Sequence, residues 1–205
     1  MLIQRTSLNK IEKKLSENSK WKILDVGCGF TANKFATTIA DILDLRDFYK
    51  EKNFIKIEDK KLPFEDNSFD FVIASHVIEH IDDFSFFLNE IQRVSKKGYI
   101  ELPTRLGDNL VFENQKEHLW WFTFDDQDKL LIAEKKKQFL EPFMSVATAK
   151  KISDNFRESF VLELYWENSI EFTINDNTDQ KIKKLSFLTI VKKFFSKKIR
   201  RLLRN

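Results

Sequence analysis

The sequence predicts an α/β fold built on one mostly parallel sheet of seven strands that ends in an antiparallel hairpin. Short apolar runs of strand type recur through the first half of the chain. Helical patterns or short crossovers separate these runs, which is typical of βαβ units around a parallel sheet. With 205 residues, 42% of them hydrophobic, the chain can bury one sizeable core.

The first elements follow from apolar spacing. Leu8, Ile11 and Leu15 recur at helical intervals and predict a helix over residues 7–16. Strands are then expected at residues 22–26, 37–43, 53–57 and 69–75. Between the first two strands, residues 32–35 leave room for a short helix at most.

Residues 82–98 carry the clearest helical pattern in the chain. Asp82 or Asp83 can cap the start, and Gly98 can end the helix. One face is apolar, made of Phe84, Phe87, Leu88, Ile91 and Val94. A fifth strand is predicted over residues 99–103, directly after this helix.

Beyond Pro103 the pattern changes. Residues 104–154 are charged and aromatic, and a helix is predicted around residues 127–139. Residues 159–166 and 169–175 then have strand character, and the pair Glu167–Asn168 between them suggests a tight turn. We therefore expect these two strands to form an antiparallel hairpin at the end of the sheet.

Composition and charge exclude several classes of protein. Cys28 is the single cysteine, so no intrachain disulfide can form, and a reducing, cytoplasmic environment fits. No apolar run reaches the roughly 18 to 20 residues that a membrane-spanning helix needs. Residues 181–205 contain ten Lys or Arg and no acid, so the rest of a chain with net charge +3 is net negative. This asymmetry argues against a nucleic-acid-binding body and predicts two parts, residues 1–178 and a basic amphipathic tail over residues 179–205.

Gly27 and Gly29 follow the first buried strand. In an open parallel sheet, ligands bind beyond the carboxyl ends of the strands, where the first turn brings the backbone close to the ligand. Glycine has no Cβ, so it allows both a tight turn and a close approach. The pair therefore predicts a ligand site at this end of the sheet.

Four motifs in order, "ILDVGCG" at 23–29, "LPFEDNSFDFV" at 62–72, "SHVIEHIDD" at 75–83 and "RVSKKGYIELP" at 93–103, make the chain resemble a known family. They are similar to the motifs of class I S-adenosylmethionine-dependent methyltransferases, particularly those that act on small molecules. The resemblance covers about residues 21–103. It implies a Rossmann-like class I methyltransferase fold and S-adenosylmethionine as the cofactor, but no particular substrate.

The resemblance also implies roles for individual residues. Asp25 and the two glycines would border the methionine part of the cofactor, and Asp41 would accept hydrogen bonds from the ribose hydroxyls. Ser75 and His76 would lie near the sulfonium, and Glu58, with Asp59 as the alternative, would face the adenine amine. The predicted cofactor-binding set is Asp25, Gly27, Cys28, Gly29, Asp41, Glu58, Asp59, Leu62, Ser75 and His76.

The chain departs from the family pattern after the glycines. Only 14 positions separate Gly27 from Asp41, so the first crossover must be shortened to about a turn or two of helix. This shortening makes Asp44 an alternative for the ribose role. Phe30 stands where the family commonly has a further glycine.

Two histidines are predicted to act in catalysis. Methyl transfer is an in-line displacement, for which the protein must hold donor and acceptor at near-attack distance, and a hydroxyl acceptor also needs a base for its proton. His76 is the predicted base by strand position, with His80 packing at the start of the following helix. His118 lies beside Trp120 and Trp121 in the segment that usually covers the substrate.

His76, Glu79 and His80 also spell HxxEH, the inverted zincin motif. That chemistry needs both histidines on one face of a helix. Here His76 directly follows a strand, and the helix is expected to start after His80. No metal is therefore predicted.

The tail has an amphipathic pattern. Apolar residues recur at steps of three or four from Phe187 to Leu202, with Lys and Arg on the opposite face. The pattern predicts a basic helix that lies on an anionic membrane surface. The alternatives are docking on the acidic body of the same chain and attraction to nucleic acid.

The sequence thus predicts methyl transfer from S-adenosylmethionine to a small-molecule or lipid- or saccharide-linked acceptor, at oxygen. The protein would be cytoplasmic and peripheral at the inner membrane face, with no specific nucleic-acid partner. One alternative is a non-catalytic binding or membrane-associated module with the same fold. The other, an NAD-binding oxidoreductase, is disfavoured by the absent third glycine. The sequence predicts no oligomeric state.

Overall fold

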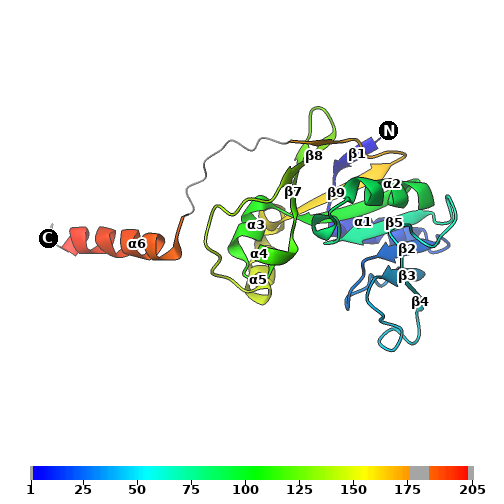
Figure 1. The fold of residues 1–205 in the computed structure, drawn as a ribbon, viewed down its shortest axis with the longest axis horizontal. Coiled ribbons are helices and arrows are strands. Elements are labelled where there is room, and N and C mark those ends of the chain that lie inside the picture. Colours follow the sequence, from blue (N-terminus) through cyan, green and yellow to red (C-terminus); the bar gives the residue numbers. More distant parts are fainter. Residues whose placement is uncertain (1, 176–184, 203–205) are drawn as a thin grey trace.

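The computed structural model describes residues 2–175 and 185–202 and has a seven-stranded sheet at its centre (Figure 1). The strands are β1 (Leu2–Arg5), β2 (Ile23–Val26), β3 (Thr38–Asp41), β4 (Asn53–Lys56), β5 (Phe71–Ser75), β6 (Lys97–Pro103) and β9 (Val161–Glu167). Their order is β1-β9-β6-β5-β2-β3-β4. The five neighbouring strands β6, β5, β2, β3 and β4 run parallel to one another, whereas β9 is antiparallel to both of its neighbours, β1 and β6. The predicted α/β class and the mostly parallel seven-stranded sheet are confirmed.

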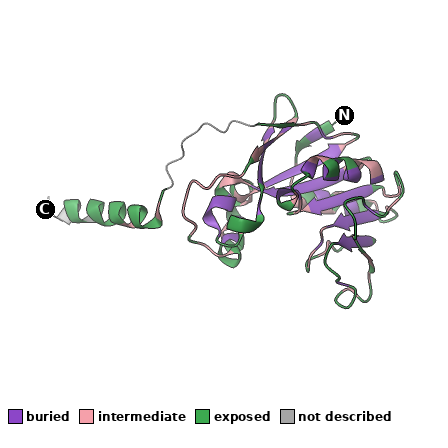
Figure 2. Cartoon of the chain, viewed as in Figure 1, coloured by how far each residue is buried: buried purple, intermediate pink, exposed green. Residues whose placement is uncertain are grey.

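The two helices predicted from apolar spacing are present. In α1 (Leu8–Glu17), the Ser7 side chain accepts a hydrogen bond from the Lys10 N–H and caps the first turn. In α2 (Phe84–Val94), Asp83 caps in the same way by accepting from the Phe86 N–H. The predicted apolar face of α2 lies in the core with strands β2, β5 and β6. Figure 2 shows this buried sheet with exposed helix faces around it.

The predicted antiparallel hairpin at the end of the sheet is wrong. After β9 the chain turns at Asn168, which has φ 72°, and leaves the sheet. β10 (Phe172–Ile174) pairs in parallel with β8 (Leu130–Lys135), which pairs in turn with β7 (Trp120–Asp125). The place beside β9 is taken by β1, from the other end of the chain. An edge accepts only one partner strand, so the local turn signal did not decide the pairing.

The helix predicted around residues 127–139 is also wrong. This segment forms β8, whose side chains alternate between more and less buried positions. Lys129, with φ 55°, ends the turn that joins β7 to β8. The antiparallel hairpin of this protein is therefore β7–β8, in a separate three-stranded sheet.

The first crossover is even shorter than expected. Residues 27–37, all of them described, contain turns and no helix between β2 and β3. Two hydrogen bonds tie this link to β2. Thr37 Oγ1 accepts from the Ile23 N–H at 2.8 Å, and the Asp25 side chain accepts from the Asn33 N–H at 2.6 Å. The crossover thus rests on hydrogen bonds instead of helix packing.

Three helices gather at one end of the sheet, beyond β6 (Figure 1). They are α3 (Arg105–Leu110), α4 (Asn114–Glu117) and α5 (Val146–Phe160). A short 3₁₀ helix, η1 (Ile78–His80), follows β5. These elements surround the carboxyl ends of the central parallel strands, where a ligand site is expected.

The predicted basic tail is helical over α6 (Phe187–Leu202), which extends away from the rest of the chain (Figures 1 and 2). Residues 179–184 and 203–205 of that predicted tail lie outside the described residues. Among the helices that the structure does describe, none is both long enough and apolar enough to cross a membrane.

Candidate functional site

A cavity of about 660 Å³ opens at the carboxyl ends of β2, β5 and β6. The strands and their following turns supply one wall, and α3, α4 and α5 supply the other. The predicted site residues that line it are Asp25, Gly27, Cys28, Gly29, Ser75, His76 and His118. His80, Glu101 and Arg157 line it as well. The cavity therefore joins the glycine turn to three histidines.

The glycine turn needs glycine for two different reasons. Gly27 has φ 70°, and a Cβ built there would lie 2.4 Å from Cγ2 of Val77. Gly29 has φ 49° but open space around it. Its N–H donates to Asp41 Oδ2 and its carbonyl accepts from the Tyr49 hydroxyl, both at 2.8 Å. The turn is thus fixed in place and presents bare backbone to the cavity.

Asp25 is the buried acid of the turn. Its side chain is almost fully enclosed, and Oδ2 accepts the short hydrogen bond from the Asn33 N–H. Burial raises the pKa of Asp25 to about 6, although the bond from Asn33 and the charge of Lys52 oppose that rise. The raised pKa makes the carboxyl group easier to protonate than an exposed aspartate, and a ligand that donates to it would favour the ionised form.

Four of the predicted cofactor residues lie outside the cavity lining. Asp41 is buried, and its two oxygens accept from the N–H groups of Gly29 and Leu43, both at 2.8 Å. Glu58 and Asp59 are exposed, and Leu62 is in the core. Asp44, the alternative for the ribose role, is paired with Arg46 at the surface. Among these acids, Asp41 is therefore the one tied directly to the glycine turn.

His76 stands at the end of β5 with φ 54°, a conformation that is strained for a residue with a Cβ. Its Nδ1 lies 3.2 Å from Glu79 Oε1 and its Nε2 lies 3.1 Å from Glu101 Oε1. Partial desolvation disfavours the charged ring, but the contacts with Glu101 and Glu79 outweigh it and raise the pKa of His76 to about 10. A ring that is protonated at neutral pH has no lone pair to accept a proton, so this geometry does not suit the base role predicted for His76.

Glu101 on β6 joins His76 to a wider network. It accepts hydrogen bonds from the Tyr99 hydroxyl at 2.6 Å and from Arg157 of α5 at 2.8 Å. Burial by itself would raise the pKa of Glu101, but His76, Tyr99 and Arg157 lower it to about 2. The network holds α5 over the carboxyl end of the sheet with a fixed set of charges.

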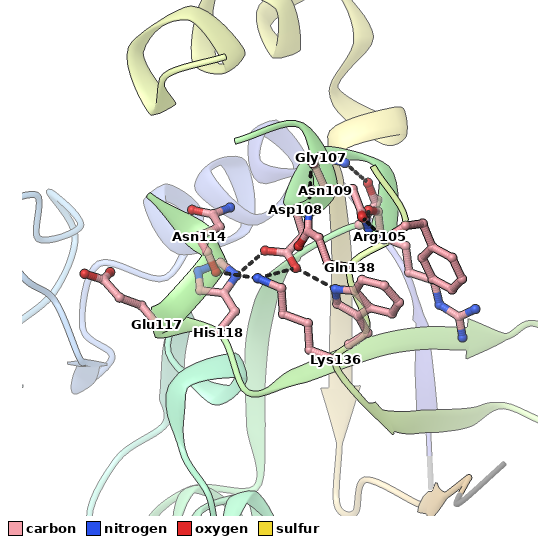
Figure 3. A network of polar contacts seen from close by, with 12 residues as sticks. Arg105, Gly107, Asp108, Asn109, Asn114, Glu117, His118, Lys136 and Gln138 are labelled. Atoms are coloured by element: carbon pink, nitrogen blue, oxygen red, sulfur yellow. Dashed lines mark hydrogen bonds and ion pairs between the residues drawn. The ribbon is translucent and has the colours of Figure 1, made fainter. Parts of the chain in front are cut away.

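His118 is held from behind by Asp108 (Figure 3). Nδ1 of His118 lies 2.6 Å from Oδ1 of Asp108, and both side chains are buried. Oδ2 of Asp108 accepts from Trp121 Nε1 at 2.5 Å and lies 3.0 Å from Lys136 Nζ. Burial opposes ionisation of Asp108, but the contacts with His118, Trp121 and Lys136 outweigh it and lower its pKa. Since Nδ1 faces Asp108, Nε2 is the nitrogen of His118 left for a ligand.

His80 also has a nitrogen free for chemistry. Its Nδ1 lies 3.1 Å from the carbonyl oxygen of Glu117, to which it donates as a neutral ring. Partial desolvation of the ring lowers the pKa of His80, the charge of Glu79 opposes that shift, and the neighbouring His118 adds to it. The ring is therefore neutral at pH 7, with Nε2 as its acceptor. The rings of His80 and His118 meet edge to face at 4.5 Å between centroids.

Sequence reasoning missed part of this site. It assigned His80 to packing, although the motif that contains His76 and Glu79 also contains this histidine. Asp108 and Arg157 carry no local signal, because each meets its partner through the fold and not through sequence spacing.

Comparison with known proteins gives a consistent set of similarities. Residues 24–100 match the family model described as "Methyltransferase domain". The chain is 37% identical over 109 residues to the uncharacterized protein MJ0638 of Methanocaldococcus jannaschii, covering 49% of this chain and 48% of that protein. It is 33% identical over 113 residues to a ubiquinone biosynthesis O-methyltransferase of Rickettsia bellii, covering 47% of each. The chain thus spans about half the length of the curated relatives it matches.

Two solved structures are similar over more of the chain. The PH0226 protein from Pyrococcus horikoshii matches with a TM-score of 0.43 and 19% identity, over 78% of this chain and 89% of that one. A structure described as a SAM-dependent methyltransferase, from Aquifex aeolicus, matches with a TM-score of 0.42 and 15% identity, over 77% and 87%.

Proposed function

We propose that this protein transfers a methyl group from S-adenosylmethionine to a hydroxyl of a small-molecule acceptor. Residues 24–100 match a methyltransferase domain, and the motifs of this segment are those of the class I, S-adenosylmethionine-dependent family. One observation carries the proposal. The cavity places the bare glycine turn of β2 opposite a histidine whose second nitrogen is held by a buried carboxylate.

The glycine turn fits the cofactor. Asp25, Gly27, Cys28 and Gly29 offer backbone groups and one carboxylate at the cavity wall, which suits the charged methionine part of S-adenosylmethionine. Ser75 and His76 lie at the end of β5, where the sulfonium would be. Asp41 would shape the turn through Gly29 and accept from the ribose with its remaining lone pairs. Glu58, Asp59 and Leu62 stay proposals for the adenine side.

When bound, S-adenosylmethionine supplies an activated methyl group and a neutral sulfide as leaving group. The chain must align the acceptor with that methyl group and keep water out. As the acceptor oxygen forms its new bond to carbon, its proton passes to Nε2 of His118. Asp108 holds the Nδ1–H tautomer and stabilises the imidazolium that results. Transfer to oxygen is supported by the O-methyltransferase name of the Rickettsia relative.

His76 has a different part in this scheme. Its imidazolium lies between Glu79 and Glu101 and so fixes the end of β5 against β6. We assign it to positioning the turn beside the sulfonium and assign the proton to His118.

The tail supports a second proposal, attachment to an anionic membrane surface. Exposed apolar side chains run along α6, with Leu188 at 67% and Phe194 at 64% exposure. Exposed Lys and Arg lie on the same helix, and residues 181–205 contain no acid. Such a helix gains apolar burial and attraction to acidic headgroups together. The protein would then be peripheral at the cytoplasmic face, and its acceptor lipid-linked.

Vesicle flotation tests the tail. Full-length protein should float with vesicles that contain about one third phosphatidylglycerol and stay behind with pure phosphatidylcholine. Replacing Leu188 and Phe194 by Ser should abolish flotation. Equal flotation of this double variant would reject the membrane proposal.

Thermal unfolding with S-adenosylhomocysteine tests the cofactor site, with NAD as the control. A ligand at about one hundred times its Kd adds roughly 2.7 kcal/mol, which raises the midpoint by roughly 5 to 10 °C for a domain of this size. Asp25→Asn keeps an oxygen for the Asn33 N–H and removes a buried charge, so the variant should unfold no earlier than the wild type yet lose this rise. A rise with NAD alone would instead support the oxidoreductase alternative, and no rise with either ligand would support the non-catalytic module.

A further inference from the structure

Glu79 has a buried oxygen that nothing in the described part of the chain satisfies. The residue is 0% exposed. Oε1 faces Nδ1 of His76, but Oε2 has no hydrogen-bond partner. A buried, unpaired carboxylate oxygen is costly, so such a group usually binds a proton, a cation or a metal ion.

Two imidazoles lie near the Glu79 carboxylate. Glu79, His80 and His118 each offer one ligand atom, and the three atoms lie within 4.8 Å of one another. Each imidazole has its Nδ1 side engaged, by the Glu117 carbonyl for His80 and by Asp108 for His118. Nε2 is therefore the free nitrogen of both rings.

The backbone holds the two contributing segments together. The Leu119 N–H donates to the Glu79 carbonyl at 2.7 Å, so η1 and the residue that precedes β7 are joined beside the three side chains. The contact between His80 Nδ1 and the Glu117 carbonyl adds a second link. Metal-binding histidines characteristically direct their other ring nitrogen at a carboxylate or a carbonyl. Here Nδ1 of His80 lies 3.1 Å from the Glu117 carbonyl oxygen, and Nδ1 of His118 lies 2.6 Å from Asp108 Oδ1.

We propose that Glu79, His80 and His118 form a binding site for a divalent transition metal, with Zn²⁺ as the preferred ion. Two imidazole nitrogens and one carboxylate oxygen are a ligand set of catalytic zinc sites, which keep a further position open. The cavity lies on the open side, because His80 and His118 both line it. The site differs from the HxxEH reading of the sequence, since His118 replaces His76, whose nitrogens both face carboxylates.

The three ligand atoms must move closer for an ion to bind. Zn–N and Zn–O bonds of about 2.0 to 2.1 Å place tetrahedral ligands about 3.3 Å apart. His80 is exposed and supplies the movement by rotating its side chain, while Glu79 and His118 are held by their surroundings. An ion held by these residues would make a hydroxyl at the open position more acidic, and its proton would pass to water in the cavity; His118 would then serve as a ligand and not as the base.

The inference does not depend on methyl transfer, and metal binding itself tests it. Chelator-treated full-length protein is titrated with Zn²⁺ and with Co²⁺, whose visible absorption reports the coordination. We expect one equivalent to bind, with Co²⁺ bands of the intensity typical of four or five ligands. Glu79→Gln and His80→Ala should each weaken binding by at least about tenfold.

Glu117→Gln is the matched control, since it makes the same change to an exposed carboxylate of the same cavity and should bind as the wild type does. If Glu79→Gln fails to fold, His80→Ala still decides, because that side chain is exposed. No binding by the wild type, or equal binding by His80→Ala, would overturn the site. If the metal site is overturned in this way, a rise of the thermal unfolding midpoint with S-adenosylhomocysteine in the presence of chelator would still support the cofactor proposal.

Discussion

Gly27 provides the sharpest test of the glycine turn. Replacing it by alanine adds a Cβ 2.4 Å from Cγ2 and 2.9 Å from Cγ1 of Val77. The positive φ of 70° costs an alanine roughly 1 to 2 kcal/mol, and the overlap with Val77 adds roughly 1 to 3 kcal/mol. We therefore expect Gly27→Ala to lower the free energy of unfolding by about 2 to 5 kcal/mol and the midpoint by about 10 °C.

Gly29→Ala is the control for this prediction. Its φ of 49° carries the same backbone cost, but its Cβ meets no atom within 4 Å. Its midpoint should fall by only about 2 to 8 °C. Adding Val77→Ala to Gly27→Ala should recover the part of the midpoint loss that comes from overlap with the Val77 methyl groups. Differential scanning calorimetry measures all four proteins, and equal losses at the two glycines, or no recovery with Val77→Ala, would refute the reasoning.

Three further outcomes follow from the site. Asp108→Asn should lower the methyl-transfer rate by about a hundredfold or more, because His118 loses the partner that fixes its tautomer. Binding of S-adenosylhomocysteine should stay unchanged. Rate assays measure the first effect and calorimetric titration measures the second. The pKa of His76 is about 10 when folded and 6.5 in the reference state, so its charge stabilises the fold fully below pH 6.5 and less and less as pH rises to 10. The midpoint difference between wild type and His76→Asn should therefore shrink over that range, and a constant difference would contradict the raised pKa. The pKa of Glu101 is about 2, so its contribution is present above pH 4.5 and is lost as pH falls towards 2, which an acid titration of Glu101→Gln against the wild type measures.

Local signals predicted the elements that depend on local physics. The apolar face of α2 and its Asp83 cap lie where the sequence places them, because helix periodicity and capping involve neighbours three or four residues apart. The parallel strands were predictable for a related reason. Strands buried on both faces are short continuous apolar runs, as in β2 and β5.

Strand pairing was the weak point of the sequence reading. β10 has the composition of a strand and follows a turn, yet it pairs with β8, more than thirty residues earlier. Pairing depends on which edge is free, and β1 already covers β9. The helix expected over residues 127–139 failed similarly, since β7 offers β8 an antiparallel partner that overrides local propensity.

By itself, the sequence determined the similarity to a methyltransferase domain over residues 24–100, the glycine turn and the acid that precedes it, because these features depend on local motifs and need no distant partner. Only the tertiary structure decided the chemistry of the histidines. His76 is charged because Glu101 arrives from β6, and His118 is oriented because Asp108 arrives from α3. Protonation and tautomer depend on which groups lie within about 3 Å, and the fold alone sets those distances.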